Sequence, residues 1–389
     1  MNLRKRVVWG MEIEEIKKEG LGMNIDELLK TAMQWGASDV HLAVPATPMF
    51  RMQSQIVPAG EEPLTPGTMR EIFEAITGER QRTMFNKDLE LDCAYSISGV
   101  GRFRVNASMQ RGSIALTIRC LPVRIPTIEE LGLPELCKTL IMKKKGLILV
   151  TGSTSSGKST TQAAMIGYLN ERESRKVLTI EDPIEYLHAN KKCLIVQREL
   201  DSDTPSFASA MKHALRQNSD VILVGEMRDM ATIATAITAA ETGHLVLATA
   251  HTQGAANVIS RLISEFPSMQ QDQLRTQLAL TIEAVLTQIL LPRADGKGRV
   301  AIFEIMLASY AIRNLIRENK SHQITSMIET SSQLGMQTLD QALEEVVKKG
   351  LVKLEDAMLR SQRPDDLEKA CQGQRARAPA AESANGKTR

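Results

Sequence analysis

One short run of residues constrains the fold of this chain more than any other feature. Gly152 to Ser159 reads GSTSSGKS, which fits the pattern GxxxxGK followed by Ser or Thr. It follows the apolar run Gly146 to Val150 and precedes an expected helix over 160–169. In that context the glycines let the loop aim backbone N–H groups at phosphate oxygens. The run therefore predicts a P-loop nucleotide-binding domain of the α/β class.

The residues of this loop are the expected nucleotide ligands. Lys158 would bridge the β- and γ-phosphates of ATP, and the hydroxyl of Ser159 would hold Mg²⁺. A Gly- and Ser-rich loop without function is the alternative, and the flanking strand and helix argue against it. The predicted binding residues are Gly152, Ser153, Thr154, Ser155, Ser156, Gly157, Lys158, Ser159 and Thr160.

Three further apolar runs, at 177–180, 221–224 and 245–248, are separated by helical segments. Short, fully apolar runs of this kind are typical of strands buried on both faces of a parallel sheet. Ligands of open α/β sheets bind beyond the carboxyl ends of the strands. The polar residues that follow each run are therefore candidates for a site.

Carboxylates follow two of these three runs. Glu181, Asp182 and Glu185 come after the first and could order Mg²⁺ and polarise a water, although a solvated acidic turn is the alternative. The next run leads into Gly225 and Glu226, like a Walker B element with Gly in place of the usual Asp. Glu226 then has to supply the carboxylate, through Mg²⁺-bound water. A buried strand with a charged exit is the other interpretation.

Two histidines flank the last apolar run. His244 precedes it and His251 follows it. A His at a strand end can sense a γ-phosphate, whereas a lone His is more often structural. The two suggest a metal pair, yet the sequence has no third or fourth ligand with the spacing of a zinc site.

The N-terminal part has a different pattern. A helix is expected from the N-cap Asn24 and another over 66–76, with near-alternating strands at 39–43, 91–97, 102–109 and 114–118 broken by glycines. This predicts a small antiparallel α+β domain. Its arginines suit bidentate contact with phosphate, but a solvated strand face is favoured on the sequence alone; they are Arg102, Arg104, Arg111 and Arg119.

Composition excludes several classes of protein. Lys plus Arg is 48 against 46 for Asp plus Glu, and aromatic residues are 3% of the chain, which disfavours a nucleic-acid partner. No apolar run approaches the roughly 18 residues that cross a bilayer, so no direct membrane insertion is expected. The five cysteines are scattered and odd in number. They are typical of small buried side chains in a reducing cytosol, and we expect a cytoplasmic protein.

The order of the motifs resembles that of the secretion-superfamily ATPases. The P-loop is followed by EDPIE, GEMRD and TGH…AHT, and the likeness is closest to the twitching-motility PilT/PilU family of type IV pilus retraction ATPases. GASDVHL, GRFRVN, AIRNLIRE and GMQTLDQAL extend it over most of the chain. The resemblance implies an N-terminal PAS-like domain, a RecA-like ATPase domain, and a homohexameric ring that binds ATP and Mg²⁺ between them.

The resemblance also implies roles for single residues. Glu185 matches the catalytic base and Glu226 the Walker B acid. His244 and His251 match the His box. Arg104 and Arg119 match arginines that approach the phosphates. In the P-loop, the family usually has Pro or Ala second and Gly fifth, so Ser156 is expected to stiffen the loop.

The resemblance favours retraction over pilus assembly or type II secretion, because the four-cysteine zinc motif and longer N-terminal region of those relatives are missing. An accessory PilU-like subunit that assists a sister motor is a further alternative. A nucleic-acid translocase is a third alternative, and the nearly neutral charge and the scarce aromatic residues count against it. The motifs are mixed and leave the paralogue open.

The implied partners are copies of the same chain, an inner-membrane pilus platform protein and a paralogous retraction ATPase. The implied location is the cytoplasmic face of the membrane at the pilus base. Within AIRNLIRE, three apolar residues would face the core, while Arg313 and Arg317 are free to meet a partner or are merely solvated.

The expected organisation has six parts. It comprises an extension over 1–22, a PAS-like domain over 23–120, a linker over 121–135, a RecA-like core over 136–292, a C-terminal helical region over 293–372, and a disordered tail over 373–389.

Overall fold

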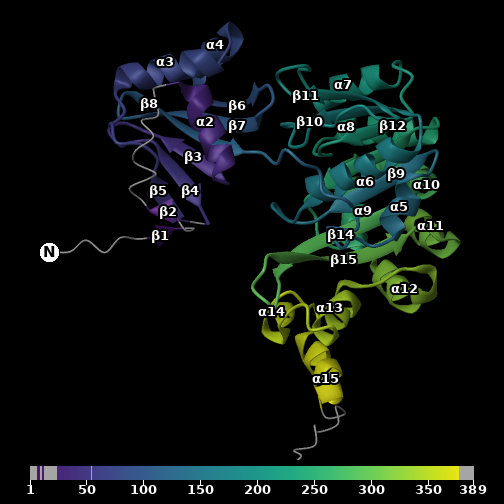
Figure 1. The fold of residues 1–389 in the computed structure, drawn as a ribbon. Helices are drawn as coiled ribbons and strands as arrows, with labels where there is room; N and C mark the ends of the chain where they lie inside the picture. The colour runs from purple at the N-terminus through teal and green to yellow at the C-terminus, as the bar shows by residue number, and fades with distance from the viewer. Residues whose placement is uncertain (1–6, 9–10, 13–23, 54, 376–389) are drawn as a thin grey trace, which may run out of the picture. The chain divides into compact units, whose positions relative to one another are not determined.

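The computed structural model describes residues 7–8, 11–12, 24–53 and 55–375, which divide into two compact units (Figure 1). The first unit takes the described residues up to Ile125 together with Pro183–Leu187, and the second takes the rest. Of the extension expected over 1–22, only the antiparallel pair β1 (Val7–Val8) and β2 (Met11–Glu12) is described. The tail expected from 373 lies outside the described residues, except that α15 (Pro364–Arg375) extends into its first residues.

The first unit is built on a six-stranded antiparallel sheet in the order β5-β4-β3-β8-β7-β6. Three of its elements were missed from the sequence, because β4, β5 and α4 lack a clear periodicity. The strands are β3 (Asp39–Leu42), β4 (Met49–Met52), β5 (Gln55–Pro58), β6 (Glu90–Ile97), β7 (Gly101–Gln110) and β8 (Ser113–Cys120), and the helices are α2 (Ile25–Gln34), α3 (Pro66–Ile76) and α4 (Glu79–Asp88).

Local sequence accounts for the predicted elements of this unit. The side chain of Asn24 accepts a hydrogen bond from Asp26 N and caps α2, as expected. Along β7, Phe103, Val105 and Ala107 are buried in one core with the helices. Because alternate side chains of a strand point to opposite faces, the intervening positions, which carry the arginines, lie on the other face of the sheet.

The second unit contains a seven-stranded sheet in the order β11-β10-β12-β13-β9-β14-β15 (Figure 1). All neighbours are parallel except β14 and β15. The strands are β9 (Gly146–Thr151), β10 (Lys176–Glu181), β11 (Leu194–Glu199), β12 (Val221–Val224), β13 (Leu245–Ala250), β14 (Ile282–Pro292) and β15 (Arg299–Leu307).

Helices cover both faces of this sheet. Residues of α5 (Leu136–Ile141) and α6 (Lys158–Arg172) form one core with it, which contains Ile148. Residues of α7 (Phe207–Ala214), α8 (Met230–Glu241), α9 (Ala255–Ser264) and α10 (Ser268–Thr281) form another, which contains Leu149. The predicted parallel sheet covered by helices is therefore present. None of the helices in the described ranges is long and apolar enough to cross a membrane.

The expected boundaries of the second unit were wrong in two places. The region from 293 was expected to be helical, yet β15 extends the sheet. The buried Glu304 interrupts the apolar run of β15, so this strand lacks the continuous apolar run that revealed the other buried strands. The linker expected over 121–135 ends earlier, because Ile128 and Leu133 are buried in the core of the second unit.

The C-terminal helices pack on the β14–β15 hairpin. Ile289 and Ile302 of the hairpin form a small core with residues such as Leu343 and Val352. The helices on the hairpin are α13 (Leu339–Lys348), α14 (Leu354–Met358) and α15. The two helices before them, α11 (Tyr310–Arg317) and α12 (Ile324–Thr330), instead pack in the core that contains residues of α9 and α10.

Candidate functional site

Three neighbouring strands end at the same edge of the parallel sheet. The order β12-β13-β9 and the register that pairs Ala250 with Thr151 bring their carboxyl ends together. The P-loop follows β9, Glu226 follows β12 and His251 follows β13. The topology thus gathers three of the predicted site elements from distant parts of the sequence.

The P-loop glycines are required by space as well as by backbone conformation. Gly152 has a φ of +141° and Gly157 a φ of +89°. A Cβ added at Gly152 would lie 2.2 Å from the carbonyl oxygen of Gln288, and one at Gly157 would lie 2.9 Å from its Nε2. The loop therefore packs tightly against β14. No larger residue fits at Gly152, where the backbone is in the way, while one at Gly157 would have to displace the Gln288 side chain.

The unusual residue of the loop is Ser155 rather than Ser156. We expected Ser156 to stiffen the loop, but Ser155 is the serine that adopts a left-handed backbone, with a φ of +62°, a conformation that favours glycine. Ser156 is instead buried, and its hydroxyl has no hydrogen-bond partner among the described residues. An orphaned hydroxyl inside an anion-binding loop fits a phosphate ligand.

Lys158 begins α6 and is almost fully buried. Its ammonium donates hydrogen bonds to the carbonyl oxygens of Gly152 at 2.8 Å and Ser153 at 2.9 Å. The positive end of the helix dipole adds to this charge. A buried cation at a helix N-terminus, under a loop rich in N–H groups, is suited to bind phosphate.

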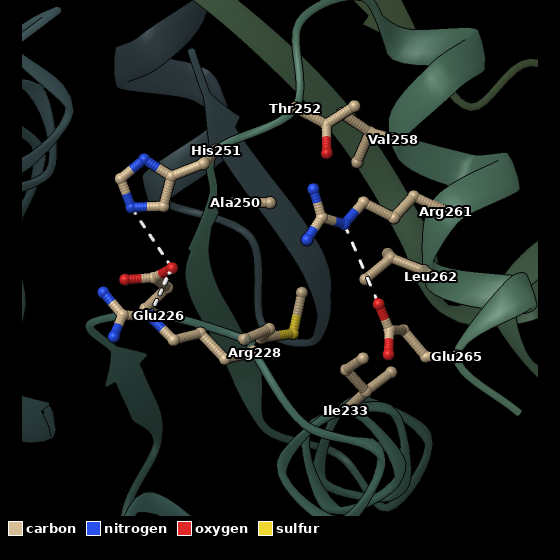
Figure 2. Close-up of a pocket in the computed structure, with 11 residues that line it drawn as sticks. Glu226, Arg228, Ile233, Ala250, His251, Thr252, Val258, Arg261, Leu262 and Glu265 are labelled. Atoms are coloured by element: carbon tan, nitrogen blue, oxygen red, sulfur yellow. Dashed lines mark ion pairs between the residues drawn. The ribbon is translucent and has the colours of Figure 1, made fainter. Parts of the chain in front are cut away.

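Glu226 lies between an arginine and a histidine (Figure 2). Its Oε1 is 2.7 Å from Arg228 Nε and 3.2 Å from His251 Nε2. Burial acts to raise the pKa of Glu226, but the hydrogen bond from Arg228 and the charges of both partners lower it below its usual value. The carboxylate is therefore charged at neutral pH.

Gly225 is required because β12 leaves the sheet against β10. Its N–H donates to Ile180 O at 2.7 Å, and an added Cβ would lie 3.1 Å from the same oxygen. A side chain such as the usual Asp would need the neighbouring backbone to move. The tight packing suits glycine at this position, and the carboxylate stands one residue later, at Glu226.

A small pocket adjoins Glu226 and His251. Figure 2 shows it bounded on the far side by the ion pair of Arg261 and Glu265. Its volume is about 30 Å³, the space of about one water molecule. This pocket is too small for a nucleotide, and the groups at its edge are the part that matters for chemistry.

The carboxylates of the acidic segment at the end of β10 belong to different units. Glu181 accepts hydrogen bonds from Thr179 Oγ1 at 2.7 Å and Gln197 Nε2 at 3.1 Å, so it is held within the second unit. Glu185 belongs to the segment Pro183–Leu187, which groups with the first unit. Within that unit, the carbonyl of Ile184 accepts a hydrogen bond from Arg102 Nε.

Arg104 and Arg119 also lie in the first unit, where they form part of a charged row. They are directly opposite each other on β7 and β8, and Arg119 is opposite Asp39, which is opposite Arg51. Asp39 is close to Arg119 at 3.1 Å and Arg51 at 3.7 Å. Arg104 is also 3.9 Å from Asp92. Like charges opposite each other in a sheet are destabilising, and the three arginines still outnumber the two carboxylates, so the row favours a bound anion.

The two histidines do not form a pair. His244 precedes β13 and its carbonyl accepts a hydrogen bond from Gly146 N, the first residue of β9. His251 follows the other end of β13, which has six residues and so spans about 20 Å. They cannot share a metal ion.

Three residues with evident roles were missed in the sequence. Arg228 pairs with Glu226, Gln288 contacts the P-loop, and Glu304 binds the start of α9. Gln288 is buried and its Oε1 accepts a hydrogen bond from Thr161 of α6 at 2.8 Å. A polar residue inside an otherwise apolar run was the available signal for Gln288 and Glu304.

The fold and the site define a P-loop nucleotide-binding protein of the α/β class. Residues 14–359 match the family of type II/IV secretion system proteins, and the chain belongs to that family.

Relatives match along nearly their whole length. The type IV pilus retractation ATPase PilT of Pseudomonas aeruginosa is 45% identical over 345 residues, which cover 89% of this chain and all of the relative. The type IV pilus ATPase PilU of the same organism is 39% identical over 345 residues, covering 89% and 90%. A crystal structure of the pilus retraction motor PilT with bound ADP superposes with a TM-score of 0.82 at 44% identity, covering 89% of this chain and 99% of that one.

Proposed function

We propose that this chain is an ATP-hydrolysing motor that powers type IV pilus retraction and hence twitching motility. The observation that carries the proposal is the P-loop with its buried Lys158, at the same sheet edge as the Glu226–His251 pair, in a chain 45% identical to a complete retraction ATPase. In this proposal the first unit is the PAS-like domain and the second the RecA-like domain.

The residues of the second unit bind and polarise ATP. Lys158 neutralises the β- and γ-phosphates, and the loop N–H groups and the Ser156 hydroxyl supply further donors. Ser159 and Glu226 offer the hard oxygen atoms that Mg²⁺ prefers, and Mg²⁺ when bound would neutralise phosphate charge. His251, 3.2 Å from Glu226, is suited to link that carboxylate to the γ-phosphate.

The residues of the first unit complete the reaction. Glu185 acts as the base that accepts a proton from the attacking water. Arg104 and Arg119 stabilise charge on the transferred phosphate, which offsets the repulsion between these two neighbours.

The motor works as a homohexamer at the cytoplasmic base of the pilus, docked on an inner-membrane platform protein. We expected Arg313 and Arg317 to be free for docking, and for Arg313 this was wrong. Its guanidinium donates to Ala279 O and is 2.9 Å from a carboxylate oxygen of Glu283. Arg317 is exposed, and with the exposed Tyr310 on the same helix it is the revised candidate for the docking surface.

A second candidate function is that of an accessory subunit beside a paralogous retraction ATPase. The 39% identity to PilU over 345 residues supports this second candidate. ATPase activity of the purified chain separates the two, because a motor hydrolyses ATP alone and an accessory subunit needs its partner.

A clean deletion in the source organism tests the direction of work. We expect cells with abundant surface pili and no twitching, restored by the wild-type chain. Bald cells would identify an assembly motor instead, and unchanged pili and twitching would reject a role in this system.

A further inference from the structure

Glu304 is a buried carboxylate for which the proposed hydrolysis has no role. It lies on β15, opposite Thr287 of β14, and is 5% exposed. A charge inside an otherwise apolar strand is costly unless it is well hydrogen-bonded. Its partners therefore indicate what it is for.

One partner is the first turn of α9. Ala255 N, at the start of this helix, donates a hydrogen bond to Glu304 Oε1 at 2.6 Å. The N-cap of α9 is Gly254, which has no side chain to satisfy that turn. Glu304 thus caps the N-terminus of α9, although it lies on a strand distant in the sequence. The dipole of α9 favours a negative charge at this position.

A second partner is the first turn of α13. Burial, and to a smaller extent the charge of Asp340, hold the pKa of Glu304 above its usual value, although hydrogen bonds from the backbone of Ala255 and Leu339 act against that rise. Gln337, just before α13, exchanges backbone hydrogen bonds with Ile305 and donates from Nε2 to Phe303 O at 2.9 Å. The GMQTLDQAL motif therefore docks α13 on β15 beside this carboxylate.

The bond to α9 bears directly on the hydrolytic site. β13 ends at Ala250 and α9 begins at Ala255, so the connecting loop is 251–254. Its first residue is His251, whose Nε2 is 3.2 Å from Glu226. Glu304 holds one end of this short loop, and β13 holds the other.

We propose that Glu304 is a positioning residue for ATP hydrolysis, which fixes the loop 251–254 so that His251 meets Glu226. The inference rests on the proposed function, because it names a further residue of the same site. Through the same carboxylate, the C-terminal helix α13 is attached to the hydrolytic site.

The test begins with Glu304→Gln, which keeps the size of the side chain but replaces one acceptor oxygen with an NH₂ donor, so that it can no longer accept from both Ala255 and Leu339. We expect kcat of the full-length protein to fall at least tenfold, while KM for ATP and the affinity for ADP change less than twofold. The matched control is Glu283→Gln on the adjacent strand, where the carboxylate is ion-paired with Lys143 and Arg313 at the opposite sheet edge. Its kcat should stay within twofold at a comparable loss of thermal stability.

A double-mutant cycle with His251→Ala tests whether Glu304 acts through the histidine. In that background Glu304→Gln should lower kcat no further. Multiplicative effects, or a fall in kcat equal to that of Glu283→Gln, would overturn the inference. If Glu304→Gln does not fold, Glu304→Asp, which retains the charge, takes its place in the same cycle. Absence of ATPase activity in the wild type would reject the proposed function itself, whereas an active wild type with an unaffected Glu304→Gln would reject only this inference.

Discussion

The two sheets place their functional side chains in different ways. In the parallel sheet, Lys158, Glu226 and His251 come from three strand ends, and each is held by partners within the same unit. In the antiparallel sheet, Arg104 and Arg119 come from the middle of two strands and are set opposite each other by register. Side chains that follow the strand ends meet at one point of the sheet, whereas side chains paired by strand register form a row across it.

The difference extends to how charge is compensated. Lys158 is buried and its ammonium is satisfied by loop carbonyls. The side chain of Arg119 is 64% exposed, and its partner Asp39 is shared with Arg51. The parallel sheet therefore holds a preorganised site, while the row on the antiparallel sheet has more positive than negative charge and gains most from an added anion.

The largest effect is expected from the preorganised site. Lys158→Ala removes the charge beside the β- and γ-phosphates, so ATP turnover should fall at least ~100-fold. Steady-state ATPase assays of the purified protein measure this. Turnover like that of the wild type would show that the P-loop is not the site of hydrolysis.

The next comparison is between two carboxylates, one in each unit. Glu226→Gln and Glu185→Gln keep their shapes and lose a charge, so each should cut kcat by roughly 100-fold or less while ATP still binds. Fluorescence titration measures ATP binding, and a steady-state assay of the same samples measures kcat. Loss of binding in both variants would make these carboxylates structural.

Smaller effects are expected from the charged row. Arg104→Ala and Arg119→Ala should lower kcat by about tenfold and ATP affinity by less, because their contact is strongest with transition-state charge. Arg51→Ala is the matched control from the same row and should change kcat less than about twofold, the scale of a neutral surface substitution. Equal changes in kcat for all three variants would instead support the interpretation that these arginines lie on a solvated strand face.

The two arginines of α11 contrast a half-buried cation, which is ion-paired, with an exposed one. Arg313→Ala removes a half-buried group that caps the end of α10 and pairs with Glu283, which should cost roughly 1–3 kcal/mol of unfolding free energy. Arg317→Ala should cost less than ~0.5 kcal/mol, yet abolish retraction with ATPase activity intact. Thermal melts and twitching assays test both, and normal twitching would leave Arg317 merely solvated.

The smallest effect is expected at Ser155. Ser155→Gly relieves the left-handed backbone but adds freedom to the unfolded chain, so the free energy of unfolding should change by less than ~1 kcal/mol. Turnover should rise slightly or stay unchanged. A marked loss of turnover would mean that the Ser155 side chain itself contacts the nucleotide.

Much of the parallel sheet was predictable because its signals are local. The apolar run, the glycine-bounded loop and the helix that follows are consecutive in the chain, and so are β12 and Glu226. The strands β11, β14 and β15 were missed, because polar residues such as Gln197, Gln288 and Glu304 interrupt the apolar runs that revealed the other strands. The roles of these polar residues follow from their tertiary contacts: Gln288 contacts the P-loop after β9, and Glu304 accepts a hydrogen bond from the start of α9.

The sequence by itself determined the class of the fold, the P-loop and the family, since each depends on residues close together in the chain. Tertiary structure decided which polar groups meet. It paired Glu226 with Arg228 and His251, pressed the P-loop against Gln288, engaged Arg313 and left Arg317 exposed. The reason is physical: such contacts follow from strand order and register, which join residues far apart in the chain and have no local pattern.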